Sequence, residues 1–316
     1  MAAVFARRND DGARLKTILN LILLCGLAGS AVAAPVPGPA PVPYVLEGTE
    51  VRDVHAQALN RDYQVFVALP DSYRTSNRSY PVLFVTDANY AFPVARNIAQ
   101  RLSKHAGLEE VIVVGLSYAK ADTPIYSRRR DYTPSTPRVH DYTSDMPGRA
   151  PAFGEADAYG RFIAAEVFPL IAAHYRADMH RKIFVGHSYG SLLGLQVLLT
   201  RPDTFEHYIL GSPSLWYDQG VMFDREQDYA KGHKNMQASV FFGIGGRETL
   251  AAGKKRSRSE DDADMVADVR DFNTALKSRR YPGLTTRLEV YPDEDHASVF
   301  PFLLTHGLRA YLKKEK

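Results

Sequence analysis

The residues best suited to covalent chemistry lie in a glycine-flanked segment, Gly186-His187-Ser188-Tyr189-Gly190. A short apolar run, residues 183–185, precedes this segment, and a leucine-rich stretch, residues 191–200, follows it. Strand, tight turn and helix in this order are typical of a nucleophile elbow, whose strained backbone exposes the serine hydroxyl at the end of a sheet. A side chain at either glycine would clash with neighbouring backbone. The alternative is an ordinary serine in a strand-to-helix turn, but the flanking strand and helix favour a nucleophile.

A serine hydroxyl is a weak nucleophile and needs a positioned base. Among the 10 histidines, His296 has the most suitable position, between the last predicted strand and the last predicted helix. We expect the loop that carries it to lie at the same sheet edge as Ser188, within reach of the serine. His187 is adjacent to the serine in sequence and is predicted to be structural.

An acidic residue is expected to orient the imidazole and to stabilise its protonated form. The expected order along the chain is serine, acid, histidine, which places the acid after the intervening strand, residues 239–244. Glu248 follows that strand after two glycines and is the leading candidate. If no acid acts, Ser188 and His296 form a dyad. The rival acids lie in a charged loop or beside the histidine: Asp261, Asp262, Asp264, Asp293 and Asp295.

The negative charge that develops on an attacked carbonyl oxygen needs backbone N–H donors. The first donor is expected from Tyr189, the residue after the serine. The second is expected from residues 87–90, which follow the apolar strand 81–86, and Asn89 is favoured within this segment.

Two sets of side chains are candidates for substrate binding. Arg128, Arg129 and Arg130 could bind a carboxylate, catecholate or phosphate group of a substrate. Charge runs are more often paired within the protein, so these arginines could instead anchor their loop. The possible carboxylate partners are Asp131, Asp141 and Asp145. Trp216 could stack on an aromatic acyl group, or it could pack in the core or in a lid.

Strands and helices alternate along the chain, which predicts an α/β fold with a mostly parallel sheet and helices on both faces. Several predicted strands are apolar throughout, as expected for strands buried on both faces. The predicted strands are 63–69, 81–86, 111–115, 183–185, 207–210, 239–244 and 286–291. The predicted helices are 91–105, 156–175, 191–200, 264–277 and 299–313.

Three polar segments interrupt this alternation and are predicted to be loop insertions in one domain, residues 49–316. They are residues 117–153, 215–237 and 247–262. Ligands of open α/β sheets bind beyond the carboxyl ends of the strands, where such loops gather. We therefore expect these segments to form the rim of the site.

The first 33 residues have the pattern of a cleaved signal peptide: basic residues, the apolar run 18–27, and an A-x-A signal ending at Ala33. About ten apolar residues are too few to span a bilayer, so no membrane anchor is expected in the mature protein. Residues 34–48 begin with a proline-rich stretch and are predicted to be a linker. Cys25 is the only cysteine and lies in the predicted leader. An export signal without disulfides indicates a periplasmic or secreted bacterial protein.

The net charge of the whole chain is +3, and removal of four basic and two acidic leader residues would lower it by two. This balance gives no electrostatic reason to expect a nucleic acid or membrane partner. The mature chain would have no cysteine for a thiolate metal site, and no metal or cofactor is expected. The expected partner is a small-molecule ester.

Together with the serine, histidine and acid candidates, several segments make the chain resemble the esterase D-like branch of α/β hydrolases. This branch includes ferri-siderophore esterases, feruloyl esterases and S-formylglutathione hydrolase. The resemblance covers about residues 50–312. It rests on residues 80–89 (YPVLFVTDAN), 127–134 (SRRRDYTP), 186–191 (GHSYGS), 210–217 (LGSPSLWY), 245–248 (GGRE) and 295–299 (DHASV).

The resemblance implies an α/β-hydrolase fold, a serine mechanism without a metal, and ester or thioester substrates. Ser188 and His296 match the family's catalytic positions closely, and Glu248 matches a position at which the acid varies. The chain has Asp87-Ala88 where relatives often have Asp-Gly, which bears on the second oxyanion donor. The expected function is an exported serine esterase that hydrolyses carboxylic esters, such as siderophore or aromatic acyl esters, through an acyl-enzyme. The alternatives are a non-catalytic binding protein and an acyltransferase on the same fold.

Overall fold

The computed structural model describes residues 41–139 and 142–313. The predicted signal peptide and the first part of the predicted linker lie outside the described residues. The chain divides between Val45 and Leu46. The fold described here is that of the unit that begins at Leu46.

A single eight-stranded sheet forms the centre of this unit, with the strand order β1-β2-β4-β3-β5-β6-β7-β8. The pairs β1–β2 and β2–β4 are antiparallel and all the others are parallel. The strands are β1 (Thr49–Ala56), β2 (Arg61–Ala68), β3 (Tyr80–Val85), β4 (Ile112–Leu116), β5 (Ala177–His187), β6 (His207–Gly211), β7 (Ala238–Gly245) and β8 (Leu284–Tyr291).

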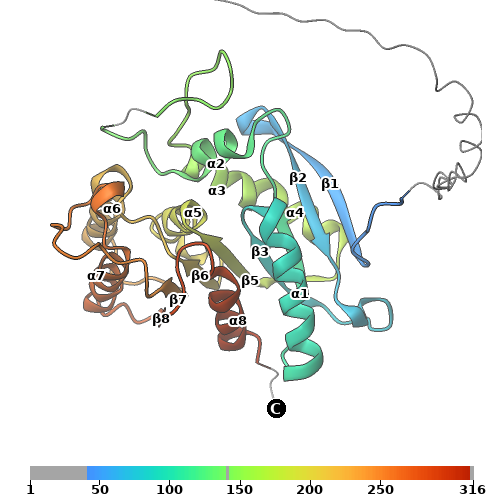
Figure 1. Cartoon of the computed structure of the whole chain (residues 1–316). Coiled ribbons are helices and arrows are strands. Elements are labelled where there is room, and N and C mark those ends of the chain that lie inside the picture. Colours follow the sequence, from blue (N-terminus) through green and yellow to red (C-terminus); the bar gives the residue numbers. More distant parts are fainter. Residues whose placement is uncertain (1–40, 140–141, 314–316) are drawn as a thin grey trace, which may run out of the picture. The chain divides into compact units, whose positions relative to one another are not determined.

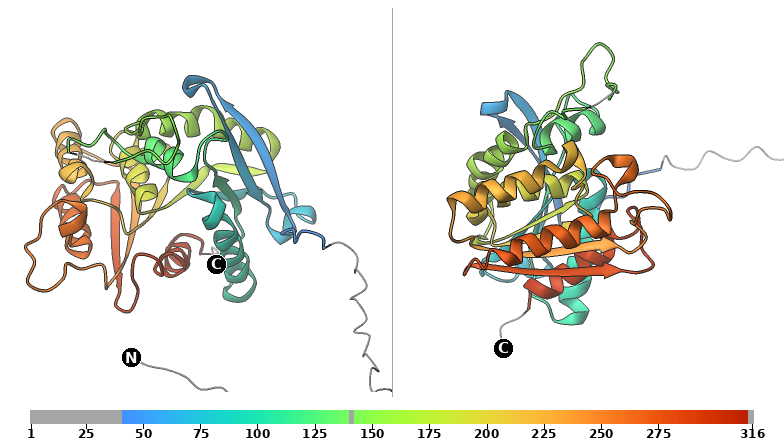
Figure 2. Two further views of the ribbon diagram at one scale, coloured as in Figure 1. Left: turned by 45° about the horizontal axis from the view of Figure 1, so that its top comes forward. Right: turned by 90° about the vertical axis from the view of Figure 1, so that its left-hand side faces the viewer.

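Helices cover both faces of the sheet, as the two views of Figure 2 show. Helices α1 and α8 lie together on one face, and α2, α3 and α5 lie on the other (Figure 1). The helices are α1 (Ala88–Ala106), α2 (Pro124–Tyr132), α3 (Ala156–Phe162), α4 (Phe168–His174), α5 (Tyr189–Leu198), α6 (Tyr217–Gly232), α7 (Met265–Ser278) and α8 (Phe300–Tyr311). The predicted α/β-hydrolase fold, with a mostly parallel sheet between two helical layers, is confirmed.

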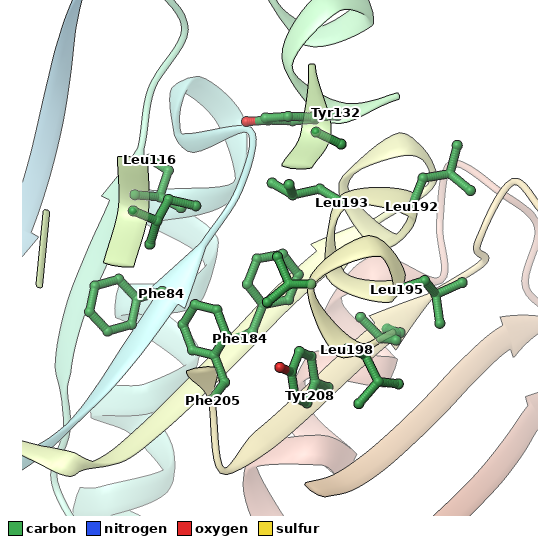
Figure 3. Packing of buried hydrophobic residues seen from close by; sticks show 14 of the residues in the cluster. Phe84, Leu116, Tyr132, Phe184, Leu192, Leu193, Leu195, Leu198, Phe205 and Tyr208 are labelled. Carbon is green, nitrogen blue, oxygen red and sulfur yellow. The ribbon is translucent and has the colours of Figure 1, made fainter. Parts of the chain in front are cut away.

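The alternation of side chains along β5 divides the core into two layers. Phe184 faces the layer that contains α5, whereas Ile183 and Val185 face the layer that contains α1 and α8. Helix α5 is apolar on nearly all sides, which is typical of a helix buried in the middle of a protein. Figure 3 shows its leucines beside Phe184 and Tyr208. This packing holds the two elements on either side of Ser188 rigidly.

The structure contains one strand that the sequence did not predict, β1. Charged residues interrupt its apolar alternation, because β1 is an edge strand that pairs with β2 alone and leaves much of its surface exposed. The predicted helix 156–175 is also divided. A π-helical turn, Ile163–Val167, separates α3 from α4.

Two of the predicted loop insertions contain helices. Helix α2 lies within 117–153 and begins at the N-cap Thr123, whose side chain accepts a hydrogen bond from the Tyr126 amide. It has no apolar stripe, so hydrophobic periodicity could not reveal it. Helix α6 lies within 215–237, and its first turn is interrupted by left-handed residues at 218–220. The third segment, 247–262, contains only a short 3₁₀ turn, Glu260–Asp262.

Within the described ranges, no helix is both long and apolar enough to cross a membrane.

Candidate active site

Ser188 lies at the junction between β5 and α5, in a backbone conformation that is rare for any residue other than glycine. Its φ is 58° and its ψ is −117°. Such a conformation costs of order 1–3 kcal/mol and persists only where the surroundings enforce it. Here the Ser188 amide donates to the Gly211 carbonyl at 2.9 Å, and the Ser188 carbonyl accepts from Ser191 and Leu192 at the start of α5. The strained turn predicted from the sequence is therefore present.

The two glycines beside Ser188 are required by close contacts. A Cβ atom at Gly186 would lie 2.3 Å from the carbonyl oxygen of Gly190. A Cβ atom at Gly190 would lie 2.3 Å from Oγ1 of Thr86. The first clash is with backbone, as predicted, and the second is with a side chain of the segment that follows β3.

His296 and Glu248 lie side by side after the last two strands of the sheet. Nδ1 of His296 is 2.6 Å from Oε2 of Glu248. The other carboxylate oxygen, Oε1, accepts the Ser212 hydroxyl at 2.6 Å and the Gly245 amide at 2.8 Å. The Glu248 side chain is only 3% exposed. Each of its oxygens thus has a hydrogen-bond partner, and its position relative to the imidazole is well defined.

This arrangement determines how the imidazole is protonated. An ionised carboxylate can only accept hydrogen bonds, so Nδ1 of neutral His296 must carry the hydrogen that it shares with Glu248. Nε2 is then left with a free lone pair and can act as a base. An imidazolium formed by protonation of Nε2 would be stabilised by the adjacent carboxylate.

Four of the five rival acids contact groups other than His296. Asp293 lies at the surface near Arg247, and Oδ1 of Asp295 accepts amides of its own loop. Asp264 caps the N-terminus of α7, and Asp262 pairs with Lys254. Asp261 is exposed.

The Ser188 hydroxyl is half-buried, and its hydrogen-bond partner is the buried hydroxyl of Ser214, at 3.2 Å. Across residues 41–139 and 142–313, the structure contains no hydrogen bond between Ser188 and His296. Such bonds are often long in enzymes without substrate and shorten when substrate binds. The ring centroid of His296 lies 4.6 Å from that of His187, the residue before the serine.

His187 is buried between His296 and Phe300. Burial, followed by electrostatic repulsion between a protonated His187 and its neighbours His296 and Arg128, lowers the pKa of His187 to about 3. The side chain is therefore neutral at neutral pH and packs against the base. These contacts agree with a structural role.

The backbone amides expected to bind an oxyanion lie at the first turns of two helices. Tyr189 is the first residue of α5, and Ala88 and Asn89 open α1. Helix α1 begins three residues earlier than predicted, so residues 88–90 are helical and not a loop. The first amides of a helix have no carbonyl partner within it and can bind anions. Asn89 is exposed and Ala88 is buried.

The three arginines of α2 point toward protein groups. Arg128 donates from Nε to Asp87 Oδ1 at 2.8 Å and from Nη2 to the His187 carbonyl at 3.1 Å. Arg130 is buried between Asp122 and Asp131. Arg130 therefore anchors its segment through ion pairs within the protein, which is the alternative to substrate binding that was considered for these arginines.

Arg129 donates to the Thr143 carbonyl at 3.0 Å and lies over the rings of Tyr142 and Phe153. Of the other predicted carboxylate partners, Asp145 accepts a hydrogen bond from Thr123, and Asp141 lies outside the described residues.

Trp216 packs beside the residue that follows the nucleophile. Its ring centroid lies 6.1 Å from that of Tyr189, and the Tyr189 ring also contacts that of Tyr217 at 5.6 Å. Trp216 is 9% exposed, so most of its surface is used in packing.

The sequence suggested no role for the side chains of three polar residues near the site: Asp87, Ser212 and Ser214. All three are buried and follow the carboxyl ends of β3 or β6. Their position directly after parallel strands could have identified them, because ligands of open α/β sheets bind beyond the carboxyl ends of the strands.

In the part of the chain that the structure describes, no group of three or more histidine, cysteine, aspartate or glutamate side chains is arranged to hold a metal ion.

Comparison with known proteins identifies relatives of the whole fold. Residues 56–311 match the model of the Esterase family, whose description is "Putative esterase". The chain is 31% identical over 275 residues to the ferri-bacillibactin esterase BesA of Bacillus subtilis (strain 168), covering 84% of this chain and 90% of that protein. It is 27% identical over 270 residues to a siderophore enterobactin esterase of Emericella nidulans, covering 78% and 88%, respectively.

Solved structures have the same architecture. An IroE-like serine hydrolase from Shewanella oneidensis is 25% identical and matches with a TM-score of 0.69, over 84% of this chain and 80% of that chain. The BES protein from Bacillus cereus is 23% identical and matches with a TM-score of 0.70, over 89% and 100%, respectively; this likeness concerns the fold alone. The family match and the similarity to BesA each span most of the folded unit. The chain therefore belongs to this esterase family and is a carboxylic ester hydrolase.

Proposed function

We propose that the protein is a serine esterase that hydrolyses its substrate through an acyl-enzyme, with Ser188 as nucleophile, His296 as base and Glu248 as the acid of the triad. The observation that carries the proposal is the 2.6 Å contact between Glu248 and His296, beside a serine held in a strained strand-to-helix turn. A serine and a base oriented by a third group are the recurring signature of such catalysis.

In the first half of the reaction, Oγ of Ser188 attacks the ester carbonyl while Nε2 of His296 accepts its proton. The tetrahedral oxyanion is bound by the Tyr189 amide and by an amide at the start of α1, that of Ala88 or the predicted Asn89. Collapse of this intermediate breaks the bond to the alcohol, which leaves with the proton from His296. Ser188 is then acylated.

In the second half, water attacks the acyl-enzyme and gives its proton to Nε2 of His296. The second tetrahedral intermediate releases the carboxylic acid, and the proton returns to Ser188. Glu248 stabilises the imidazolium in both halves without becoming protonated.

For the substrate, we propose an ester of siderophore type. This choice is supported by the names of the relatives BesA and the enterobactin esterase. It is also supported by the half-buried aromatic ring of Tyr189 next to the nucleophile, which could contact an aromatic acyl group. Feruloyl esters are the competing aromatic substrates.

Turnover tests the proposal directly. We expect the purified protein, residues 34–316, to hydrolyse p-nitrophenyl acetate, and to hydrolyse a catecholate siderophore ester with a higher kcat/KM than a feruloyl ester. Matched assays with Ser188→Ala measure the background rate. A preference for the feruloyl ester would change the substrate class, and a wild-type rate equal to that of Ser188→Ala would overturn the mechanism.

We further propose that the protein is exported and acts in the periplasm or outside the cell. The support is the basic, apolar and A-x-A pattern that ends at Ala33. Sequencing of the N-terminus of protein recovered from cell fractions tests this. We expect Ala34 in the periplasm or the medium, whereas an intact chain that begins at Met1 in the cytosol would contradict export.

A further inference from the structure

Asp87 is a buried carboxylate at the edge of the site that the mechanism above does not use. It follows β3, is 1% exposed, and has a left-handed backbone with φ of 55°. Its Oδ1 accepts the Tyr118 hydroxyl at 2.7 Å and Nε of Arg128 at 2.8 Å. Burying a carboxylate is costly unless it is paired, so this residue depends on its partners.

Arg128 connects Asp87 to the nucleophile strand. While Nε binds Asp87, Nη2 donates to the carbonyl of His187, the residue before Ser188, at 3.1 Å. The guanidinium also lies over the Tyr189 ring, 5.1 Å from its centroid. One side chain thus contacts both neighbours of the serine and the segment after β3.

The backbone of Asp87 determines where α1 begins. Its amide donates to the Tyr132 hydroxyl at 3.2 Å, and its carbonyl accepts the amides of Tyr90 and Ala91. The amides of Ala88 and Asn89, which are candidates for oxyanion binding, follow directly. A shift of Asp87 would therefore move these amides relative to Ser188.

The charge of Asp87 also matters, because a carboxylate near the site opposes the formation of an oxyanion. Its Oδ2 has no hydrogen-bond partner among the described residues and lies 3.3 Å from the Cβ position of Gly190, two residues after the nucleophile. Burial is the largest influence on the pKa of Arg128 and lowers it, but the charge and hydrogen bond of Asp87, together with Tyr118 and Tyr132, outweigh burial and raise the pKa. The guanidinium remains charged and neutralises the carboxylate.

We propose that Asp87 and Arg128 form a positioning pair, in which Arg128 neutralises Asp87 and ties the oxyanion-binding end of α1 to the nucleophile strand. This inference rests on the proposed serine mechanism. It assigns Arg128 a role that differs from binding an anionic substrate, since both of its hydrogen bonds above are made to the protein. The pair contributes to catalysis indirectly, because it fixes the distance between the donor amides and the reacting carbonyl.

A double-mutant cycle on a neutral and an anionic ester tests the pair. The variants are Asp87→Asn, Arg128→Met and the double variant, assayed with p-nitrophenyl acetate and p-nitrophenyl hydrogen succinate. Arg149→Met is the matched control. Arg149 lies in the same segment, residues 117–153, and its partner Asp122 is still paired with Arg130 when Arg149 is replaced. Near-UV circular dichroism and melting temperatures verify folding.

We expect Arg128→Met to lower kcat for the acetate by about 100-fold with KM nearly unchanged. Small displacements of groups that stabilise the transition state cause losses of this size. Asp87→Asn lowers kcat by about tenfold, and its addition to Arg128→Met raises kcat by about tenfold, because the unpaired carboxylate is removed. Arg149→Met stays within about twofold of wild type. Loss of folded protein would also lower the apparent kcat at unchanged KM, so the melting temperatures and the rescue by Asp87→Asn distinguish mispositioning from destabilisation.

An anion-binding role for Arg128 would give a different pattern: a higher KM for the succinate, wild-type rates on the acetate, and no rescue by Asp87→Asn. That pattern overturns the positioning pair while wild-type turnover and the Ser188 dependence stand. If Arg128→Met does not fold, Arg128→Lys replaces it, since lysine keeps the charge but lacks the planar fork. A tenfold loss of kcat then supports the pair, and an unchanged kcat on the acetate overturns it.

Discussion

Glu248 holds His296 with one carboxylate oxygen while Ser212 and Gly245 hold the other. The distances are 2.6 Å from Oε2 to Nδ1 of His296, 2.6 Å from Oε1 to the Ser212 hydroxyl, and 2.8 Å from Oε1 to the Gly245 amide. The carboxylate therefore cannot rotate without losing three hydrogen bonds. A base whose orientation is fixed in this way is ready for proton transfer before the substrate arrives.

Replacement of the acid tests its role. We expect Glu248→Gln to lower kcat by about 10⁴, roughly 5 kcal/mol of barrier, because an amide can donate to Nδ1 and favour the wrong tautomer. Steady-state kinetics on p-nitrophenyl acetate measure the effect. Asp264→Asn and Asp295→Asn are controls that remove a carboxylate nearby, and both are expected to retain kcat. If kcat of one control variant fell strongly while Glu248→Gln kept a normal kcat, the aspartate replaced in that control would be the acid of the triad. Normal kcat values in all three variants would indicate a Ser188–His296 dyad.

Loss of the second partner of Glu248 is expected to have a smaller effect. Ser212→Ala removes one of two donors to Oε1, and a hydrogen bond to a charged group contributes about 1.5–3 kcal/mol. We expect a fall in kcat of about tenfold or more with little change in KM, since the Gly245 amide remains. Ser239→Ala is the matched control, because Ser239 is the second residue of the neighbouring strand β7 and bonds only with Thr285 among the described side chains. An equal rate for Ser212→Ala and wild type would show that the Gly245 amide suffices.

The contacts around Glu248 illustrate what sequence could and could not predict. The order of strands places Glu248 and His296 at one sheet edge, so their proximity followed from topology alone. Buried strands and the apolar α5 were evident because burial on all sides leaves a continuous apolar run. By contrast, α2 is polar and stabilised by buried ion pairs such as that of Arg130, which periodicity does not detect. Asp87 and Arg128 are 41 positions apart, and only the tertiary fold brings them together.

The close contact at Gly190 predicts a rescue. Gly190→Ala places a methyl group 2.3 Å from Oγ1 of Thr86, and overpacking of this kind costs about 1–3 kcal/mol. We expect a lower melting temperature for Gly190→Ala and partial recovery in the double variant with Thr86→Ala, which removes the clashing hydroxyl. Thermal unfolding followed by circular dichroism measures both. Additive losses in the double variant would mean that Thr86 is not the limiting contact.

His187 predicts a pH dependence of stability. Its folded pKa of about 3 is below its ordinary value of 6.5, so the unfolded chain binds more protons between these values. Stability attributable to His187 is therefore fully present above pH 6.5 and is lost as pH falls toward 3, by at most about 5 kcal/mol. Urea unfolding from pH 7.5 to 4.5 measures this slope. We expect a shallower slope for His187→Phe, whereas equal slopes would show that His187 does not titrate differently on unfolding.

The central claim is that Ser188 becomes acylated, and mass spectrometry of the labelled protein tests it most directly. A fluorophosphonate reacts with an activated serine and leaves a stable adduct where the acyl group would form. We expect one adduct per chain, located by peptide mapping on Ser188, and neither adduct nor ester hydrolysis in Ser188→Ala. An adduct on another serine, or full hydrolytic activity in Ser188→Ala, would contradict the account.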